Sequence, residues 1–463
     1  MERENNSQLK PRNRGWGARM LRRYLSFVNH PVYFRHIYTP GRERMPQDGT
    51  PVVLVSNHQN CLIDPLALVF ILSDRKPRFL ARASVFKHPL LDKIIRGLGA
   101  LPTYRAKFDG VKGVAKNKGT LEEVAKSLSH GETVVLYPEG QHQNKRWLGA
   151  FSQAYLKMAF GAAEEFGFER EVYVMPTANH YAHYRLPREE MMILFGEPVA
   201  LSPYYEEYKA DPRGVMSKVN DVVRGQIESM MLNVEDLDHY EAIDFLREGS
   251  FGREYARGLG LNPAYLPDKL ESDKRLVAEL KKATEENAEK MEELYEESRK
   301  LGRKIRKMGV REWLFERPRT VGELILWTLL MLVGLPLFGS AMAATWLVFL
   351  APVLANHLFI KDKQFRGSIN LAATLLVTYP LCGLIPVIVM LCKGLLLSAL
   401  GYLVAFPLMI IYASNYMRWG QKLLGYARFV FAPKGEVEKV ARGRKKLYEE
   451  LNEVLREGGI KVK

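Results

Sequence analysis

From residue 50 to about residue 201, short apolar runs alternate with segments whose apolar positions recur at helical spacing. The runs PVVLVS (51–56), TVVLYP (133–138) and EVYVMP (171–176) have the length and β-branched content of strands. The segments LLDKIIRGLGAL (90–101) and GTLEEVAKSL (119–128) have the spacing of amphipathic helices. This alternation predicts an α/β domain.

A charged segment between Asp268 and Gly309 carries apolar residues at approximate helical spacing and contains no proline. This pattern predicts a long helix or a helical hairpin. A coiled coil is disfavoured, because the apolar positions do not keep a seven-residue repeat. We interpret the segment as an arm that packs on the rest of the chain.

Two apolar stretches follow, Leu324 to Ile360 and Gly367 to Met417, and Lys393 is the single charged residue in them. The first stretch would measure roughly 55 Å as a helix, whereas a bilayer core is about 30 Å thick and needs about 20 residues per crossing. We therefore expect its glycines and prolines to shape two short crossings or a hairpin. Basic residues in 361–366 and after Arg418 place these flanks on the cytoplasmic side.

The composition favours a membrane over other anionic partners. Lys and Arg number 67 against 52 Asp and Glu, giving a net charge of +15, which by charge alone suits nucleic acid, an anionic membrane or an anionic substrate. The apolar stretches favour the membrane, and residues 10–35 blend basic and aromatic residues as helices at a membrane surface do. A soluble helix packed on the next domain is the alternative. The three cysteines form no readable disulfide or zinc framework, and the first 45 residues lack a secretory signal pattern.

The candidate chemistry lies in NHQNCLIDP (57–65), directly after the first apolar run. A hydroxyl group is a poor nucleophile at neutral pH, so acyl transfer onto it needs a base, and His58 suits that task. Asp64 would fix the tautomer of the imidazole and stabilise its protonated form. By spacing alone, a helix cap with a satisfied surface pair explains the two residues as well.

Three further blocks carry polar residues at the ends of strand-like runs. In GALPTYR (99–105), Arg105 is a cation that could grip a phosphate. In LYPEGQH (136–142), Glu139 and Gly140 form a turn where glycine permits close approach of a ligand. YVMPTANHY (173–181) adds a further strand, in which His180 is interpreted as structural. Each block alone has an ordinary structural explanation.

Taken in order, these four blocks resemble the glycerolipid acyltransferase superfamily, over about residues 30 to 205. The resemblance implies an α/β catalytic domain that takes acyl-CoA or acyl carrier protein as donor. It implies His58 as base, Asp64 as its partner and Arg105 as a phosphate-binding residue. Glu139 and Gly140 would belong to the acceptor site. The basic residues Arg82 and Lys87, in FLARASVFKHP (79–89), match a basic position between the first two blocks and could also face phosphate.

Two departures from the family pattern matter. The usual spacing is His-x4-Asp, while here five residues separate His58 from Asp64, so the corner must hold one more residue. A branch of fungal-type glycerol-phosphate acyltransferases, with similar bacterial proteins, has this longer spacing and hydrophobic C-terminal segments. His142 stands where many relatives have arginine, which puts acceptor-phosphate contacts there in doubt.

The expected fold class is α/β, with a mixed sheet flanked by helices, followed by a helical arm and an all-α membrane region. The expected divisions are a basic membrane-surface segment (1–45), a catalytic domain (46–205), a helical extension (206–318), membrane-embedded helices (319–420) and a basic cytoplasmic tail (421–463).

The expected activity is transfer of a fatty acyl group to glycerol 3-phosphate or 1-acylglycerol 3-phosphate, at the cytoplasmic face of a bacterial inner membrane. Neither metal nor bound cofactor is expected, since the thioester donor is already activated, and the partners are membrane lipids and the substrates, with no nucleic acid. A different lyso-lipid acceptor and a non-catalytic lipid-binding scaffold are the alternatives. A covalent hydrolase is disfavoured, because the chain has no G-x-S-x-G elbow.

Overall fold

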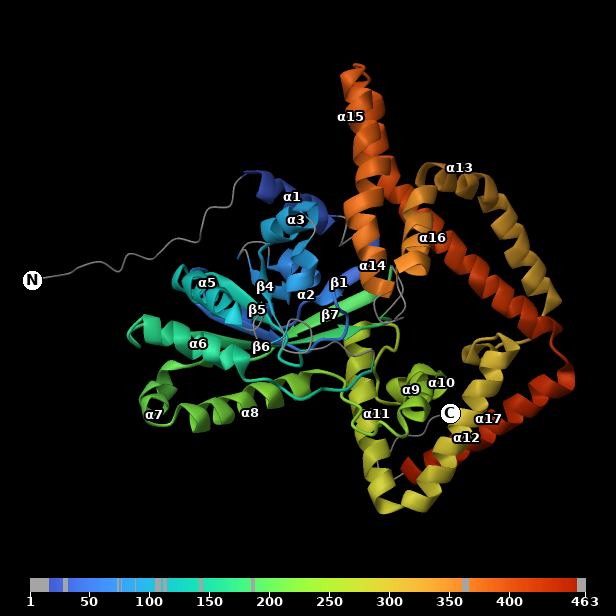
Figure 1. Cartoon of the computed structure of the whole chain (residues 1–463). Coiled ribbons are helices and arrows are strands. Elements are labelled where there is room, and N and C mark those ends of the chain that lie inside the picture. Colours follow the sequence, from blue (N-terminus) through green and yellow to red (C-terminus); the bar gives the residue numbers. More distant parts are fainter. Residues whose placement is uncertain are drawn as a thin grey trace, which may run out of the picture. The chain divides into compact units, whose positions relative to one another are not determined.

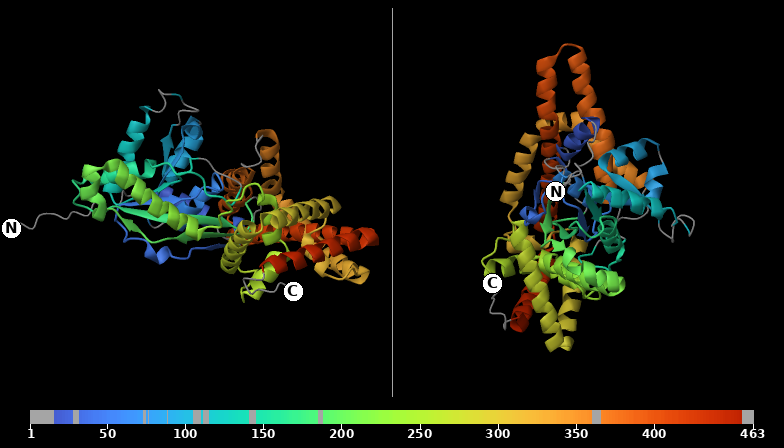
Figure 2. Two further views of the ribbon diagram at one scale, coloured as in Figure 1. Left: turned by 90° about the horizontal axis from the view of Figure 1, so that it is seen from below. Right: turned by 90° about the vertical axis from the view of Figure 1, so that its left-hand side faces the viewer.

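A computed structural model gives the fold of the chain (Figures 1 and 2). It describes residues 16–27, 32–72, 75, 77–87, 89–104, 110, 115–140, 145–184, 188–359 and 366–455. These residues form two compact units. One unit is Met1–Met231 with Ala351–Val377, and the other is Leu232–Leu350 with Thr378–Lys463. The five-part division expected from the sequence remains a prediction.

The first unit is built on an eight-stranded sheet in the order β1-β7-β6-β2-β5-β3-β4, with β8 paired to β6. Strands β2 to β6 run parallel to one another, whereas β7 and β8 run antiparallel to β6, and β1 runs parallel to β7. The predicted mixed sheet is thus confirmed. The strands are β1 (His36–Tyr38), β2 (Val52–Ser56), β3 (Arg78–Arg82), β4 (Ala100–Thr103), β5 (Thr133–Leu136), β6 (Tyr173–Tyr181), β7 (Glu190–Phe195) and β8 (Val199–Ala200).

Strand β2 is the centre of the parallel part, and all five of its residues are buried. Its sequence, VVLVS, is β-branched at three positions, which suits a strand covered on both faces. Strands β5 and β6 flank it in parallel register, so the carboxyl ends of all three strands meet at one edge of the sheet. Ligands of open α/β sheets bind outside this edge.

Helices cover the sheet of this unit (Figure 1). Helix α2 begins just after β2 and is buried at eight of its nine positions, so it is a core helix rather than a surface helix. The described helices of this unit are α1 (Trp16–Phe27), α2 (Ile63–Ile71), α3 (Pro89–Leu98), α5 (Asn117–Ser129), α6 (Ala154–Glu165), α7 (Tyr205–Ala210), α8 (Pro212–Met230) and α14 (Arg366–Ala373).

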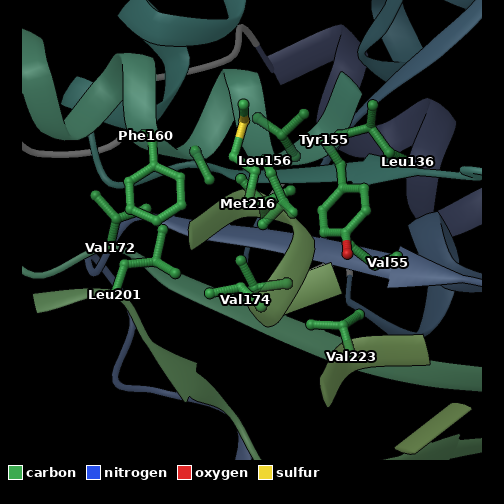
Figure 3. Close-up of a cluster of buried hydrophobic side chains, with 14 of the residues drawn as sticks. Val55, Leu136, Tyr155, Leu156, Phe160, Val172, Val174, Leu201, Met216 and Val223 are labelled. Carbon is green, nitrogen blue, oxygen red and sulfur yellow. The ribbon is translucent and has the colours of Figure 1, made fainter. Parts of the chain in front are cut away.

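A large apolar cluster lies between the central strands and helices α6 and α8 (Figure 3). Val55 and Val174 contribute from the sheet, Leu156 and Phe160 from α6, and Val223 from α8. The ring of Phe160 is fully buried and stacks on Tyr208 with ring centroids 4.0 Å apart. This packing holds the strands in the register that fixes the carboxyl edge.

The second unit is helical among its described residues. The predicted arm is two helices, α11 and α12, which contact each other. They are separated at Asn287, whose backbone is non-helical and whose side chain accepts from the Lys290 N–H to cap α12. The helices are α9 (Tyr240–Glu248), α10 (Ser250–Gly258), α11 (Leu266–Glu286), α12 (Ala288–Met308), α13 (Val321–Phe359, ending in the first unit), α15 (Ile385–Cys392), α16 (Leu396–Phe431) and α17 (Lys434–Val454).

Two helices, Val321–His357 and Leu396–Phe431, are long and apolar enough to cross a membrane. The apolar segment Pro380–Cys392 is shorter than the about 20 residues that a crossing needs. The break expected between 324 and 360 is not observed, since α13 continues through Pro336 and Pro352. Near Pro336, hydroxyl groups of Tyr412 and Tyr416 donate to carbonyls of Gly334 and Met331, at 2.9 and 2.6 Å. A single proline removes one backbone donor from the helix, which long apolar helices tolerate. The predicted basic turn at 361–366 lies largely outside the described residues.

We expect Phe160→Ala to lower the free energy of unfolding by about 3–5 kcal/mol, because the ring leaves a cavity in the packed cluster. Chemical denaturation of the detergent-purified protein measures the change. Lys157→Ala, exposed on the same helix, is the control and should stay within about 0.5 kcal/mol of the wild type. Equal stability of the two variants would contradict this account of the core.

Candidate active site

Directly after β2, the side chain of Asn57 continues the hydrogen bonding between β2 and β6. The Asn57 amide accepts from the Asn179 N–H at 2.7 Å and donates to the Asn179 carbonyl at 3.2 Å, as a strand residue would. The Asn179 amide in turn donates to the Asn57 carbonyl at 3.3 Å. All of these groups are buried, so the pairing of β2 with β6 is held firmly at the point where the next residue, His58, leaves the sheet.

His58 and Asp64 meet as the sequence predicts. The His58 Nδ1 atom lies 2.8 Å from Asp64 Oδ2, and the His58 side chain is 14% exposed while that of Asp64 is 0% exposed. A carboxylate at Nδ1 leaves the opposite ring nitrogen, Nε2, to accept a proton. Solvent and substrate can therefore reach the imidazole but not its partner.

The buried Asp64 carboxylate accepts hydrogen bonds from four groups. Oδ2 receives the backbone N–H groups of Gln59 and Asn60, each at 2.8 Å, in addition to the imidazole. Oδ1 receives the hydroxyl of Tyr181, at the end of β6. Asp64 also lies in the first turn of α2, where the helix dipole favours a negative charge. These interactions offset the cost of burying the charge.

The extra residue of the His-x5-Asp spacing is accommodated by a turn. Residues 59–62 curl around the carboxylate, and the Asp64 N–H donates back to the Asn60 carbonyl at 3.0 Å. The Asn60 amide donates to the Tyr184 carbonyl at 2.7 Å, which fixes the outside of the turn. The longer spacing is thus compatible with a closed pair.

Glu139 links the ends of two strands. Its carboxylate accepts the His58 N–H at 2.6 Å and the Gly149 N–H at 2.9 Å, and burial raises its pKa, which those two backbone hydrogen bonds partly counteract. It positions His58 by these contacts, and its predicted part in acceptor binding remains a prediction. The next residue, Gly140, has φ of +68°, and a Cβ there would meet nothing within 4 Å. The turn predicted at this glycine is present, with open space beside it.

Two tyrosines complete the site. The ring of Tyr137 stacks on the His58 imidazole, with centroids 4.4 Å apart and an interplanar angle of 25°. Burial is the main reason that the pKa values of Tyr137 and Tyr181 are well above the usual value, and the Asp64 charge adds to both. Both hydroxyls therefore stay protonated at neutral pH, and Tyr181 remains a donor to Asp64.

The sequence reasoning missed Tyr137, Tyr181 and also Arg146. Arg146 is 3% exposed and donates to the Tyr181 carbonyl at 3.0 Å, and it lies 3.4 Å from His180 Nδ1. His180 is thus buried and contacts Arg146. Both tyrosines lie inside the quoted motifs, Tyr137 in LYPEGQH and Tyr181 in YVMPTANHY, but only the strand register places them against His58 and Asp64.

Of the predicted phosphate-binding residues, the structure describes Arg82 and Lys87 but not Arg105. Arg82 ends β3, which only β5 separates from β2 in the sheet, so it lies at the same carboxyl edge as His58. Lys87 ends the 3₁₀ helix η3 (Ala83–Lys87), and both side chains are exposed. Arg105 and His142 lie outside the described residues. In the described part of the chain, His, Cys, Asp and Glu side chains form no group of three placed to hold a metal ion.

Comparison with known proteins gives consistent matches. An uncharacterized acyltransferase of Schizosaccharomyces pombe is 29% identical over 106 residues, covering 22% of this chain and 16% of that protein. The chloroplastic 1-acyl-sn-glycerol-3-phosphate acyltransferase LPAT1 of Arabidopsis thaliana is 28% identical over 136 residues, covering 29% of this chain and 35% of that protein. The matches therefore span well under half the length of these curated relatives.

Among solved structures, the 1-acyl-sn-glycerophosphate acyltransferase PlsC from Thermotoga maritima matches with 17% identity and a TM-score of 0.33, over 46% of this chain and 79% of that one. The family model named Acyltransferase matches residues 36–179, which include the ends of β2 and β5 but stop two residues before the end of β6. The fungal-type branch suggested by the longer spacing remains a prediction. Residues 36–179, which hold His58 and Asp64, therefore match the Acyltransferase family and are similar to a 1-acylglycerol-3-phosphate acyltransferase.

Proposed function

We propose that the protein transfers a fatty acyl group from a thioester, acyl-CoA or acyl carrier protein, to a hydroxyl of 1-acylglycerol 3-phosphate or glycerol 3-phosphate. The observation that carries the proposal is the His58–Asp64 contact of 2.8 Å at the carboxyl edge of the sheet. The relative from Arabidopsis thaliana, whose name gives 1-acylglycerol 3-phosphate as acceptor, supports the class of substrate.

The proposed reaction follows from the geometry of the pair. His58 Nε2 takes the proton of the acceptor hydroxyl as its oxygen attacks the thioester carbonyl carbon. The new C–O bond forms, the C–S bond breaks, and the proton passes from the imidazolium to the leaving thiolate. Asp64 holds the imidazole and stabilises its charged form without taking the proton. Tyr137, stacked on the imidazole, limits how that ring can rotate.

The acceptor phosphate is proposed to bind cations at the same edge. Arg82 and Lys87 are exposed there, and Arg105 follows β4 by two residues. Guanidinium groups bind phosphate in a bidentate manner, so the arginines are the stronger candidates. Gly140 offers space next to the base for the acceptor backbone.

The protein is proposed to be integral to a membrane, with the catalytic unit at the cytoplasmic face of a bacterial inner membrane. Helices α13 and α16 are long and apolar enough to cross a bilayer, which supports this location. Helix α1 exposes Trp16, Met20 and Phe27 among basic residues, as a helix at the membrane surface does. Anchoring would keep the enzyme where an acylated product partitions.

The deciding experiment offers labelled acyl-CoA and acyl carrier protein to purified protein, each with glycerol 3-phosphate and with 1-acylglycerol 3-phosphate. Acylated product from either acceptor supports the proposal and identifies the donor. Transfer only to a lyso-lipid that lacks a phosphate would show that the acceptor is not the one proposed. If folded protein transfers to none of these acceptors, a lipid-binding scaffold becomes the better account.

We expect His58→Ala to lower kcat by about 10²–10⁴-fold, because the general base is lost. The fold should persist, since the imidazole is partly exposed and Asp64 keeps three of its four donors. His130→Ala, beside the opposite end of β5, is the matched control and should keep wild-type turnover. Retained turnover in His58→Ala would contradict the proposed role of His58 as the general base.

We expect Tyr181→Phe to lower kcat by about tenfold, with KM little changed. The variant removes one of the four donors to the Asp64 carboxylate, and a hydrogen bond to a charged group is worth about 1.5–3 kcal/mol. Tyr173→Phe, at the opposite end of β6, controls for the loss of a hydroxyl from the same strand. Steady-state kinetics of both variants test the role of Tyr181, and a change confined to KM would argue against positioning through Asp64.

A further inference from the structure

A cavity of about 490 Å³ lies within the second unit, between α13 and α16. Its volume falls in the range of about 300–1,000 Å³ that is usual for small-molecule sites. Six of its thirteen lining residues are Trp or Tyr, and three are charged. All of these residues belong to the second unit, so the cavity is not part of the site around His58.

The two helices run antiparallel along the cavity, as three hydrogen bonds show. The Tyr426 hydroxyl donates to Glu323 at 2.9 Å, that of Tyr416 to the Met331 carbonyl at 2.6 Å, and that of Tyr412 to the Gly334 carbonyl at 2.9 Å. From Glu323 to Gly334 the lining extends along roughly 16 Å of helix, at 1.5 Å per residue. The cavity is therefore elongated along the helices.

One end of the cavity is charged and the other is apolar. Arg317, Glu323 and Lys422 line the first end, while Leu330, Met331 and Gly334 line the second. At the closed end a Cβ on Gly334 would meet the Tyr412 hydroxyl oxygen at 2.9 Å, so the helices approach closely there. A cavity with one charged end and one apolar end matches an amphipathic ligand that has a headgroup and a chain.

The charged end favours an anion. The Glu323 carboxylate already binds Arg317 at 3.2 Å and the Tyr426 hydroxyl at 2.9 Å, so its charge is compensated within the protein. Two cations against one carboxylate leave an excess of positive charge in the lining. Lys422 is exposed at its position on α16, where it can meet a headgroup.

The surroundings favour a lipid over a soluble anion. Beside the cavity, α13 exposes Leu329 at 54% and Val333 at 81%, and α16 exposes Leu408 at 58%. A ligand that enters between these helices therefore passes apolar side chains. Trp327 and Trp419, also in the lining, present an apolar ring with a polar N–H, as side chains at a lipid headgroup layer do.

We propose that this cavity binds a phosphate-bearing glycerolipid, with the phosphate at Arg317 and Lys422 and one acyl chain directed between α13 and α16 toward Gly334. The inference does not depend on acyl transfer or on His58. A site of this kind would let the protein bind a membrane lipid with residues other than those of its reaction centre.

Native mass spectrometry of delipidated, detergent-purified protein tests the site with dioleoylphosphatidate, dioleoylglycerol and inorganic phosphate as probes. We expect a phosphatidate adduct, at least tenfold weaker binding of dioleoylglycerol, and no displacement by phosphate at millimolar concentration. Equal binding of the two lipids, or displacement by phosphate alone, would overturn the proposal.

Lys422→Ala should weaken phosphatidate binding by about tenfold, the equivalent of 1.4 kcal/mol. Arg418→Ala, one turn earlier on α16 and outside the lining, removes the same charge and should leave binding unchanged. Met331→Trp should block the apolar end, whereas Leu332→Trp, at a position 56% exposed, should not. The thermal unfolding midpoint of each variant checks that it is folded.

Binding should also persist in Arg82→Ala, at a residue proposed to hold the acceptor phosphate, which separates this site from the catalytic one. Equal affinity of Lys422→Ala and Arg418→Ala, with both variants folded, would refute the assignment. So would loss of the adduct in Arg82→Ala, because the lipid would then be bound at the reaction centre.

Discussion

The compensation of one buried charge organises the catalytic unit. Asp64 is fully buried, and a carboxylate without partners would be too costly in such a place. Its four donors come from the imidazole of His58, from two backbone N–H groups of the following turn, and from Tyr181 on β6. Satisfying the charge therefore fixes the turn, the ring and the strand end together.

The parallel part of the sheet supplies the second constraint. Because β2 lies between β5 and β6 in parallel register, residues that are far apart in the sequence meet at one edge. Glu139, after β5, holds the backbone of His58, and Asn179, on β6, pairs with Asn57. The site is thus assembled from strand ends, and backbone groups carry much of its geometry.

The sequence predicted the α/β class, the His58–Asp64 pair and the turn at Gly140 because each depends on local pattern or motif order. It did not predict Tyr137 or Tyr181 as parts of the site, since their positions depend on strand register across distant segments. It also predicted a break near Pro336 that is absent, because the loss of one backbone N–H does not end a helix of 39 residues.

The burial of α2 on nearly all sides has a consequence for how the enzyme can move. The turn that carries His58 leads directly into this core helix, so the backbone that holds His58 and Asp64 can move only if a cooperative part of the core unfolds. The reaction centre therefore behaves as a fixed part of the scaffold. Any motion at this edge of the sheet must therefore come from segments with fewer buried contacts, outside β2 and α2.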